Sequence, residues 1–490
     1  MQKRELNLKP TQMTRFGIGL HPFAASLYPM SNPTPLTIGT RREPFFDGHL
    51  IEKLTRVSHE LIDPNPTSVV IPFDEPWEGA YSLYCTVIKD GNLFRMYYRG
   101  QSAIKHKESL CYAESHDGIN WVKPKLGLVP FKDRNDTNIL PIEGDQELRL
   151  THNFTPFLDR NPQAKPDEKF KAVAGNDKHG LYGFASADGI HWRLIKREAI
   201  FRDGIFDSQN VPFWSESEKC YVLYFRVWTG EGYHGLRTIA RVTSQDFINW
   251  SQTEVMSFGD MPQEEYYTNV TEPYPLAPHI YISMPSRFVQ KRRWMNSKQA
   301  KARGVLEDRE ADVSDTVFMT SRGGSAYDRY FPEAYIKPGI DPQDWVGRNN
   351  MVSLGLVQLD ATTLGLYRCR HYASDSCHLN LHTLRVDGFA RLRAGYKKGK
   401  VLTKLFTADG EQLFLNFATS AVGTVRVEVL DADGQTIEGF SGRAAPKLFG
   451  DSVHHPVKWS KNRSWSELAG RPIRIRFTLS EADLYALQQQ

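Results

Sequence analysis

The sequence has no apolar run long enough to cross a membrane and little imbalance of charge. None of its hydrophobic stretches approaches the roughly 20 residues that a membrane helix needs. The net charge is only +4 over 490 residues, too small to indicate a nucleic-acid partner. We therefore expect a globular protein that binds neither membranes nor nucleic acids.

Cysteine is scarce, and the apolar segment near the amino terminus is broken. The five cysteines are odd in number and form no CxxC pair, so we expect reduced core thiols, with no metal site and no cofactor. A long charged region comes first, and His21, Pro22 and Pro29 interrupt the apolar part, which makes a poor signal peptide. We expect a cytoplasmic protein, with a periplasmic location as the alternative; a homo-oligomer is left open.

Long amphipathic helices are also lacking, apart from one candidate near residues 290–309. From residue 68 onward, short apolar runs separated by Gly, Asp and Asn turns predict strands. Aromatic residues make up 12% of the chain, which suits sheet cores and surfaces that stack on sugar rings. The pattern predicts an all-β protein.

An internal repeat organises this β region. The template Ser-x-Asp-Gly-Ile-x-Trp occurs at residues 115–121, 186–192 and 244–250, with Phe247 replacing Gly in the third copy and a degraded copy at 321–327. Each copy follows an apolar strand, so we expect a tight Asp-Gly turn with the Trp packed beneath it. Repeated hairpins at this spacing predict a β-propeller, the alternative being a repeated hairpin in a sandwich.

Five segments are candidate starts of the innermost strands, which predicts five blades. They lie at about residues 77–87, 151–159, 205–214, 267–274 and 312–319. Because innermost strands begin near the central channel, polar residues on them are expected to converge there. These residues are Glu78, His152, Asn153, Asp207, Asn210, Glu272 and Asp315.

The composition changes after residue 400. Strict alternation in residues 425–429 and 473–477 predicts strands with one buried and one solvated face. We expect an amino-terminal arm with the first strands over 1–67, a propeller over 68–390 and a small carboxy-terminal β-sandwich over 400–490.

The stretch 205–214 is the centre of the functional interpretation. Asp207, Gln209 and Asn210 precede an apolar, aromatic run that reads as an inner strand. Asp207 is then a carboxylate at a strand mouth, which Gln209 and Asn210 are placed to orient. The alternative is that Asp207 only caps a turn.

A chain with these repeats, five inner-strand starts and a carboxy-terminal sandwich resembles the five-bladed propeller glycoside hydrolases of families 32 and 43. The resemblance covers residues 68–490. It implies three carboxylates from separate blades, and Glu78, Asp207 and Glu272 match by position. The chain departs from the family motifs where Asp207 lacks the flanking Arg and Pro, and where Glu272-Pro273 lacks the intervening Cys.

Glycoside hydrolysis uses two carboxyl groups that flank the scissile bond. Asp207 is the candidate ionised partner, and Glu272 is the candidate acid because Tyr267, Pro273 and Tyr274 offer an apolar shell that raises its pKa. The alternative candidates for a catalytic carboxyl group are Glu78, Asp315 and Glu333. The expected substrate ligands are Arg99, His152, Asn153, Gln209, Asn210, Trp345, Arg348 and Asn349.

The segment 287–309 carries many Lys and Arg residues and joins the fourth and fifth predicted blades. A basic lid over one face suits an anionic glycan, such as a sulfated, uronic or anhydrosugar-containing galactan, and a plain solvated loop is the alternative. The sequence thus predicts an exo-acting glycosidase with a poly- or oligosaccharide substrate. A non-catalytic glycan-binding propeller, a lyase and a sugar phosphorylase remain the rival functions.

Overall fold

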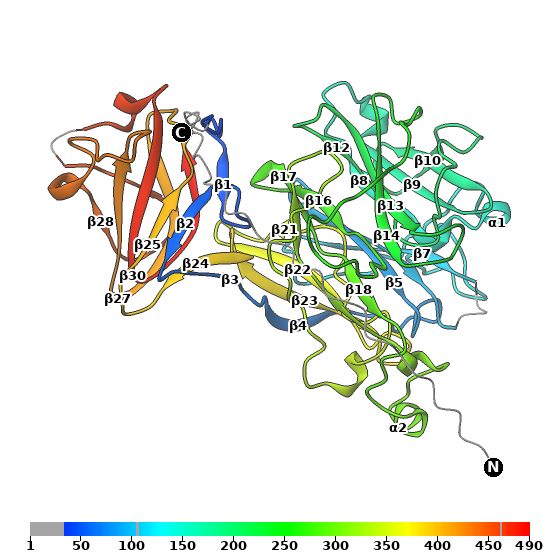
Figure 1. Cartoon of the computed structure of the whole chain (residues 1–490). Coiled ribbons are helices and arrows are strands. Elements are labelled where there is room, and N and C mark those ends of the chain that lie inside the picture. Colours follow the sequence, from blue (N-terminus) through cyan, green and yellow to red (C-terminus); the bar gives the residue numbers. More distant parts are fainter. Residues whose placement is uncertain (1–33, 104–106, 461–462) are drawn as a thin grey trace, which may run out of the picture. The chain divides into compact units, whose positions relative to one another are not determined.

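The computed structural model describes residues 34–103, 107–460 and 463–490 of the chain. It confirms the predicted fold class: an all-β chain with five blades around a central channel and a sheet-rich carboxy-terminal region (Figure 1). Helices are short. They are α1 (Asp145–Leu148), α2 (Ser297–Ala302) and 3₁₀ turns at Thr151–Asn153, Pro166–Glu168, Arg309–Ala311, Pro342–Asp344, Gly442–Ala444 and Trp465–Leu468.

The first three blades follow the chain in order. Blade 1 is β5 (Leu83–Asp90), β6 (Leu93–Gly100) and β7 (Ser109–Ser115). Blade 2 is β8 (Thr155–Leu158), β9 (Phe170–Asn176), β10 (Gly180–Ser186) and β11 (Arg193–Leu194). Blade 3 is β12 (Val211–Ser215), β13 (Cys220–Trp228), β14 (Arg237–Ser244) and β15 (Glu254–Val255). All neighbours pair antiparallel, so each blade is a meander from the channel outward.

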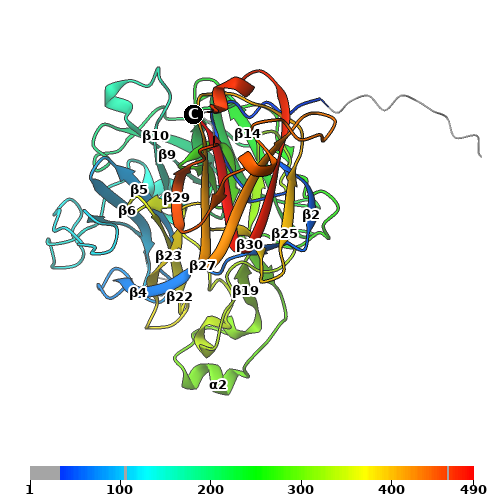
Figure 2. The ribbon, with the colours of Figure 1, turned by 90° about the vertical axis from the view of Figure 1, so that its left-hand side faces the viewer.

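Blades 4 and 5 are less regular. Blade 4 is β16 (Thr271–Tyr274), β17 (Ala277–Ser283) and β20 (Met319–Ser321), with the ribbon β18 (Ser286–Val289) and β19 (Val313–Thr316) beside it. Blade 5 is β21 (Val357–Gln358), β22 (Thr363–Arg370), β23 (His378–Arg385) and β4 (Asn65–Pro72). The outermost strand of blade 5 therefore comes from the start of the described chain, and Figures 1 and 2 both show β4 beside β23.

The prediction of a fifth inner strand at 312–319 is wrong. Val313–Thr316 pairs with β18, and Met319–Ser321 is part of blade 4. The inner segment of blade 5 is residues 351–358, where Leu354 forms a parallel bridge to Thr86 of β5 and so closes the ring between blades 5 and 1.

The Ser-x-Asp template forms the turn that the sequence predicts. In the first copy, Asp117 accepts backbone N–H groups from Ile119 and Asn120, and Ser115 donates to the same carboxylate. The indole of Trp121 donates back to Gly118. The copies at 186–192 and 244–250 repeat the Asp-centred bonds.

The carboxy-terminal region is a ten-stranded sheet with its own hydrophobic core. Its long strands alternate in burial as the sequence indicates: Val425, Val427 and Val429 are buried, and the residues between them are partly exposed. The early strands β1 to β3 pair with β24, β25 and β30 of this sheet. Its members are β1 (Arg42–Pro44), β2 (Ile51–Thr55), β3 (Ser58–Leu61), β24 (Ala390–Ala394), β25 (Gly399–Thr403), β26 (Phe406–Thr407), β27 (Leu413–Leu430), β28 (Lys447–Leu448), β29 (Asp451–Pro456) and β30 (Pro472–Gln489).

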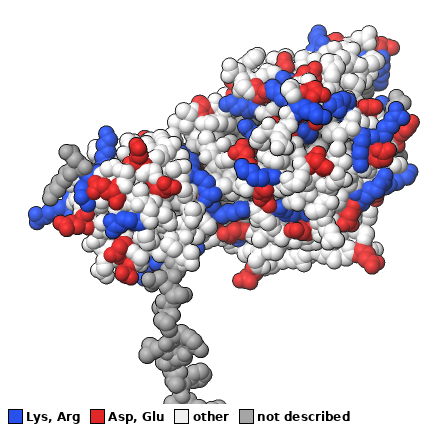
Figure 3. Space-filling model, turned by 90° about the horizontal axis from the view of Figure 1, so that it is seen from above, with Lys and Arg blue, Asp and Glu red and all other residues white. Residues whose placement is uncertain are grey.

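Three further observations concern the surface, the cysteines and the helices. Acidic and basic side chains are interspersed on the face shown in Figure 3, in keeping with the small net charge. All five cysteines are free and buried. Of the helices in the described ranges, none has the length and apolar character to span a bilayer.

Candidate functional site

Five side chains gather where the inner strands begin, at one mouth of the channel. They are Arg99 of β6, Arg226 of β13, Arg348 before the inner segment of blade 5, Tyr84 of β5, and Tyr267 before β16. We call them the arginine–tyrosine cluster. They come from blades 1, 3, 4 and 5, so only the closed ring brings them together.

The cluster is built from stacked guanidinium and phenol groups. Arg99 lies over the ring of Tyr84 at 4.9 Å, and Arg226 lies over Tyr267 at 5.0 Å. Arg348 lies 5.2 Å from the Tyr267 ring centre, and its Nε donates a 3.0 Å hydrogen bond to the Tyr267 hydroxyl. Arg99 and Arg226 are 4% and 3% exposed, so two permanent charges are held almost out of water.

A second layer adds positive charge around the cluster. Arg309 lies 5.9 Å from the ring of Tyr81, which meets Tyr372 edge to face, and Arg237 lies 5.8 Å from Tyr267. Arg309 lies near the end of the segment 290–311, a long loop that contains α2. The basic segment predicted from the sequence therefore reaches this mouth with one of its arginines.

The backbone of the cluster is held in uncommon conformations. Tyr84 and Arg348 have φ angles of 56° and 68°, the left-handed region that side chains rarely adopt. The β5–β6 register shifts between Leu83 and Thr86, and this bulge turns Tyr84 out of the regular strand. Such conformations cost on the order of 1–3 kcal/mol each and gather at functional sites.

The pKa of the Tyr267 phenol is lowered, whereas burial raises that of its cluster neighbour Tyr84 well above the ordinary value. Burial by itself raises the pKa of the Tyr267 phenol, but the charges of Arg348 and Arg226 outweigh burial. Together with hydrogen bonds from Arg348 and Tyr84 they lower the pKa of Tyr267 to about 7. A phenolate is then available at neutral pH, which an ordinary tyrosine does not offer.

Asp207 lies beside the cluster, but its orienting partner differs from the prediction. It forms an ion pair with Arg226, and its side chain is 39% exposed. The amide of Asn210 donates to the carbonyls of Phe206 and Ser208, and Gln209 points elsewhere. Asp207 is thus held by an arginine of the next strand and not by its neighbours in the loop.

His152 joins the same mouth from blade 2. Its ring lies 5.7 Å from that of Tyr84, and its Nδ1 is 2.7 Å from Glu108. Nη1 of Arg99 also lies close to the His152 ring, 3.2 Å from its Nδ1 and 3.3 Å from its Nε2. Burial opposes ionisation of Glu108, yet the bond to His152 and the nearby positive charges lower its pKa. A carboxylate-oriented imidazole is a proton-transfer group.

Gln209 forms the floor beneath the cluster. Its side-chain amide crosses from blade 3 to blade 1 and donates to the Cys85 carbonyl and the Thr86 hydroxyl, at 3.3 and 3.0 Å. Gln209 and Thr86 are 2% and 1% exposed. The predicted substrate ligand is therefore a buried bridge across the channel.

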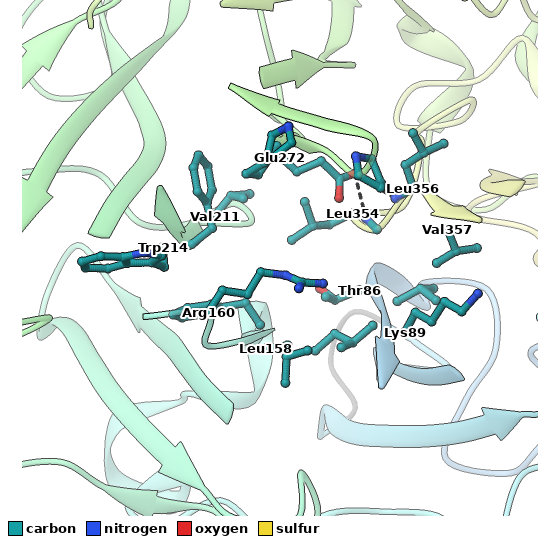
Figure 4. A pocket seen from close by; sticks show the side chains of 18 of the residues that line it. Thr86, Lys89, Leu158, Arg160, Val211, Trp214, Glu272, Leu354, Leu356 and Val357 are labelled. Atoms are coloured by element: carbon teal, nitrogen blue, oxygen red, sulfur yellow. Dashed lines mark hydrogen bonds between the residues drawn. The ribbon is translucent and has the colours of Figure 1, made fainter. Parts of the chain in front are cut away.

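Glu272 lies beyond this floor, in a separate cavity of about 490 Å³ that we call the central chamber. The chamber is lined by β5, β8, β12, β16 and residues 354–358, and Figure 4 shows Glu272 among these side chains. Its Oε1 accepts the backbone N–H groups of Gly355 and Leu356. Burial raises the pKa of Glu272 to about 7, against the lowering by those two donors.

The structure does not place Asp207 and Glu272 so that they could flank the same glycosidic bond. Asp207 contacts Arg226 at the cluster, and Glu272 lines the chamber on the other side of the Gln209 bridge. Burial raises the pKa of Glu272 as expected, and Pro273 and Tyr274 line the chamber beside it, but the expected shell residue Tyr267 lies at the cluster. The expected pairing of Glu272 with Asp207 is corrected.

The three alternative candidates for a catalytic carboxyl group lie apart from the cluster. Glu78 is buried within blade 1, where Tyr98 and Lys123 donate to it. Asp315 is paired with Arg287 on the β18–β19 ribbon. Glu333 is exposed in the loop after β20.

Several predicted sugar ligands stabilise the ring instead. The amide of Asn153 donates to the carbonyls of Phe206 and Ser208, and so ties blade 2 to the loop that carries Asp207. Asn349 donates to Gln343 and Tyr372, and its oxygen accepts the Tyr372 N–H. Trp345 does not belong to this group: it donates to Gly339, stacks on Trp294 and lines a cleft of its own.

The sequence does not reveal the roles of Tyr84, Tyr267, Arg226 and Glu108. Arg226 follows an apolar strand whose burial is predicted, and a charged residue ending such a strand is a usable signal. Tyr267 stands out in the sequence only as an apolar neighbour of Glu272. Its low pKa depends on arginines 41 and 81 residues away, which no local pattern relates to it.

No group of three or more His, Cys, Asp or Glu side chains suited to a metal ion occurs within the described ranges. Comparison with known proteins gives similarity in structure only. The sequence matches no protein-family model and no curated protein.

Among solved structures, a glycoside hydrolase is 9% identical, with 66% of this chain and 92% of that chain aligned and a TM-score of 0.46. An N-acetylgalactosamine deacetylase from F. plautii is 12% identical over 68% and 97% of the two chains, with a TM-score of 0.41. A glycoside hydrolase described with the GH130 mannoside phosphorylases is 13% identical over 70% and 96%, with a TM-score of 0.40. These similarities do not single out families 32 and 43, and at such identities they concern the fold and not the chemistry of the site.

Proposed function

We propose that this protein is a glycosidase that removes a terminal acidic sugar at the arginine–tyrosine cluster. The observation that carries the proposal is the convergence of three arginines from three blades on two tyrosine rings, Arg99 on Tyr84 and Arg226 and Arg348 on Tyr267, whose pKa is lowered to about 7. Guanidinium groups bind carboxylate and sulfate with paired, charge-assisted hydrogen bonds. The substrate class inferred is a uronic, ulosonic or sulfated sugar, which includes the anionic galactans.

Tyr267 takes the role of nucleophile in this proposal. Its phenolate oxygen attacks the anomeric carbon while the glycosidic bond to the leaving oxygen breaks. Glycosidases that use tyrosine in place of a carboxylate nucleophile are established exceptions to the two-carboxylate scheme. A phenolate stabilised by Arg226 and Arg348 has the charge available at neutral pH that this step requires.

His152 and Asp207 supply the remaining chemistry. His152, held by Glu108, gives its proton to the leaving oxygen. Water then attacks the anomeric carbon and gives a proton back to His152. The tyrosyl–sugar bond breaks in this step and releases the phenolate. Asp207, paired with Arg226, stabilises the positive charge that develops on the sugar ring. The anomeric configuration is retained because two displacements occur.

The Gln209 bridge supports exo action. Its buried side chain crosses the channel from blade 3 to blade 1 directly beneath the cluster. A terminal residue suits such a site better than the middle of a chain.

The test compares 4-methylumbelliferyl glycosides of glucuronic acid, N-acetylneuraminic acid and galactose, together with sulfated galactan oligosaccharides. We expect the wild type to release the acidic sugar, with kcat/KM rising about tenfold per pH unit up to about pH 7 as Tyr267 ionises. Tyr267→Phe should lower kcat/KM by roughly 10²–10⁴-fold and abolish this pH dependence.

Tyr335→Phe is the matched control, because Tyr335 is 1% exposed and its hydroxyl is among the buried groups of the described chain without a hydrogen-bond partner. Its activity should equal that of the wild type. Equal activity of Tyr267→Phe would remove Tyr267 from the mechanism. Binding of acidic glycans without any release of sugar would instead identify a non-catalytic glycan-binding propeller.

A second candidate is eliminative cleavage of a uronate. It is favoured by one observation: the cluster pairs a poised phenolate and an oriented imidazole with arginines, and Glu272 lies outside it. In that reaction the phenolate removes the proton next to the carboxylate that the arginines neutralise. The same assay separates the two, because elimination leaves an unsaturated product with new ultraviolet absorbance and hydrolysis does not.

A further inference from the structure

A cleft of about 700 Å³ lies beside the cluster, on the ribbon of blade 4. We call it the side cleft; it is lined by β18, β19, Glu264, Glu265 and residues 337–339, with Trp345 in its wall. Its volume lies within the range of ligand sites in proteins, about 300–1,000 Å³. Nothing in the proposed chemistry of the cluster uses it.

The side cleft shares a wall with the cluster. Phe288 lines the cleft, and its ring lies 5.5 Å from that of Tyr267. Arg348 and Arg237 lie over the same ring at 5.7 and 5.1 Å. A molecule bound at Tyr267 therefore has the side cleft as its direct neighbour across one phenyl group.

One lining residue of the cleft, Trp345, extends its aromatic surface outward through Trp294. Trp345 and Trp294 stack with ring centres 6.1 Å apart and an interplanar angle of 23°. Trp294 is nevertheless 51% exposed, and it lies on the same long loop as Arg309. Flat, exposed indole pairs of this kind suit the apolar face of a pyranose ring.

The free charge at the cleft is positive. Its acidic residues are already paired: Asp315 with Arg287, Glu264 with Arg287 and Arg329, and Glu265 with Arg237. The lining residues Arg292 and Lys337 are exposed. The cleft thus offers stacking together with attraction for a negatively charged chain.

We propose that the side cleft binds the glycan units on the leaving-group side of the cleaved bond. This rests on the proposed function of the cluster, and it deepens that function by assigning chain-length selectivity to Trp294 and Trp345. The occupant is the continuation of an anionic oligosaccharide whose end sits at Tyr267. Acidic oligosaccharides are then better substrates than short aryl glycosides, because they also fill the cleft.

Isothermal titration with oligogalacturonides and carrageenan oligosaccharides tests the proposal. The titrations use di- and hexasaccharides and the full-length Tyr267→Phe protein, so that cleavage does not interfere. The hexasaccharide of one series should bind about tenfold more tightly than its disaccharide. Adding Trp294→Ala should remove that difference; Trp345→Ala should do the same, with circular dichroism to confirm folding.

Tyr396→Ala, which removes an aromatic ring that is 85% exposed elsewhere, is the matched control and should keep the difference. An unchanged hexasaccharide preference in Trp294→Ala would overturn the proposal, as would equal binding of both lengths by the parent protein. Selective binding of the hexasaccharide that depends on Trp294, without cleavage by the wild type, would support the side cleft and contradict the proposed hydrolysis.

Discussion

Two ionisable groups five positions apart on the chain, Tyr267 and Glu272, reach the same pKa of about 7 from opposite directions. Both are buried, and burial alone raises the pKa of each. Tyr267 faces two arginines, whose charges exceed the cost of burying a phenolate. Glu272 meets only two backbone N–H dipoles, which are too weak to offset the burial of a carboxylate. The strength of the partner, and not the depth of burial, decides the sign.

Glu272 should make the stability of the protein pH-dependent. Its folded pKa lies above the unfolded value, so its contribution is fully present below about pH 4.5 and is lost as pH rises through about 7. The full span corresponds to roughly 3 kcal/mol. Glu272→Gln keeps the acceptor for both N–H groups and cannot ionise, so its Tm should gain on that of the wild type between about pH 5 and pH 8.

Thermal unfolding by differential scanning calorimetry across that range measures the effect. Glu216→Gln at the exposed rim of the same chamber is the control and should follow the wild-type profile. Parallel profiles for Glu272→Gln and wild type would show that Glu272 titrates as an ordinary exposed carboxyl.

At the scale of elements, the Ser-x-Asp hairpin joins neighbouring blades as well as turning the chain. Tyr97 of blade 1 donates to Gly189 in the second copy, and Tyr367 of blade 5 donates to Gly118 in the first. A Cβ on Gly189 would lie 2.6 Å from the Tyr97 hydroxyl, which explains the glycine. The sequence predicts these turns because their bonds are local, but the tyrosines that dock on them come from other blades.

The third copy replaces this contact by a buried ring, and its loss should be costly. Phe247 keeps the left-handed backbone, with φ of 66°, and packs against Phe157, Tyr221 and Trp250. Phe247→Gly should relieve about 1 kcal/mol of backbone strain and lose about 3–5 kcal/mol of ring packing. We expect a net destabilisation of roughly 2–4 kcal/mol.

Urea unfolding measures this change, with Gly232→Ala as a control for backbone strain alone. Gly232 has φ of 60°, and a Cβ added there would meet no atom within 4 Å beyond its chain neighbours, so a small loss is expected. A Phe247→Gly variant as stable as the wild type would mean that strain, and not packing, dominates at this turn.

At the scale of the molecule, the ring closes through strands far apart in sequence. β4 pairs with β23 although Ile71 and Leu379 are about 300 positions apart, and β5 meets Leu354 of blade 5. The class of fold and four of the five inner-strand starts follow from local periodicity. The fifth blade escapes such a prediction because its inner segment is short, and because its outer strand precedes blade 1 in the chain. The cluster shares this limit, since its five residues meet only in the closed ring.

Breaking β4 should therefore cost more than breaking another exposed strand. Val69 on β4 pairs with Asn380 and is 51% exposed, so Val69→Pro acts mainly on the backbone. We expect a loss of about 3 kcal/mol or more, because the ring opens. Val255→Pro on the two-residue edge strand β15, where Val255 is 58% exposed, is the matched control and should lose less. Calorimetry that gives equal Tm values for the two variants would argue against closure by β4.

The bridge made by Gln209 crosses the channel of the ring beneath the cluster. Under the proposed exo action, a chain end that reaches the cluster leaves on the side from which it entered, because the bridge lies beneath it. The proposed exo action therefore predicts that the freed sugar leaves through the same opening before another chain end binds. The proposed reaction then has one opening for both the entering chain end and the departing sugar.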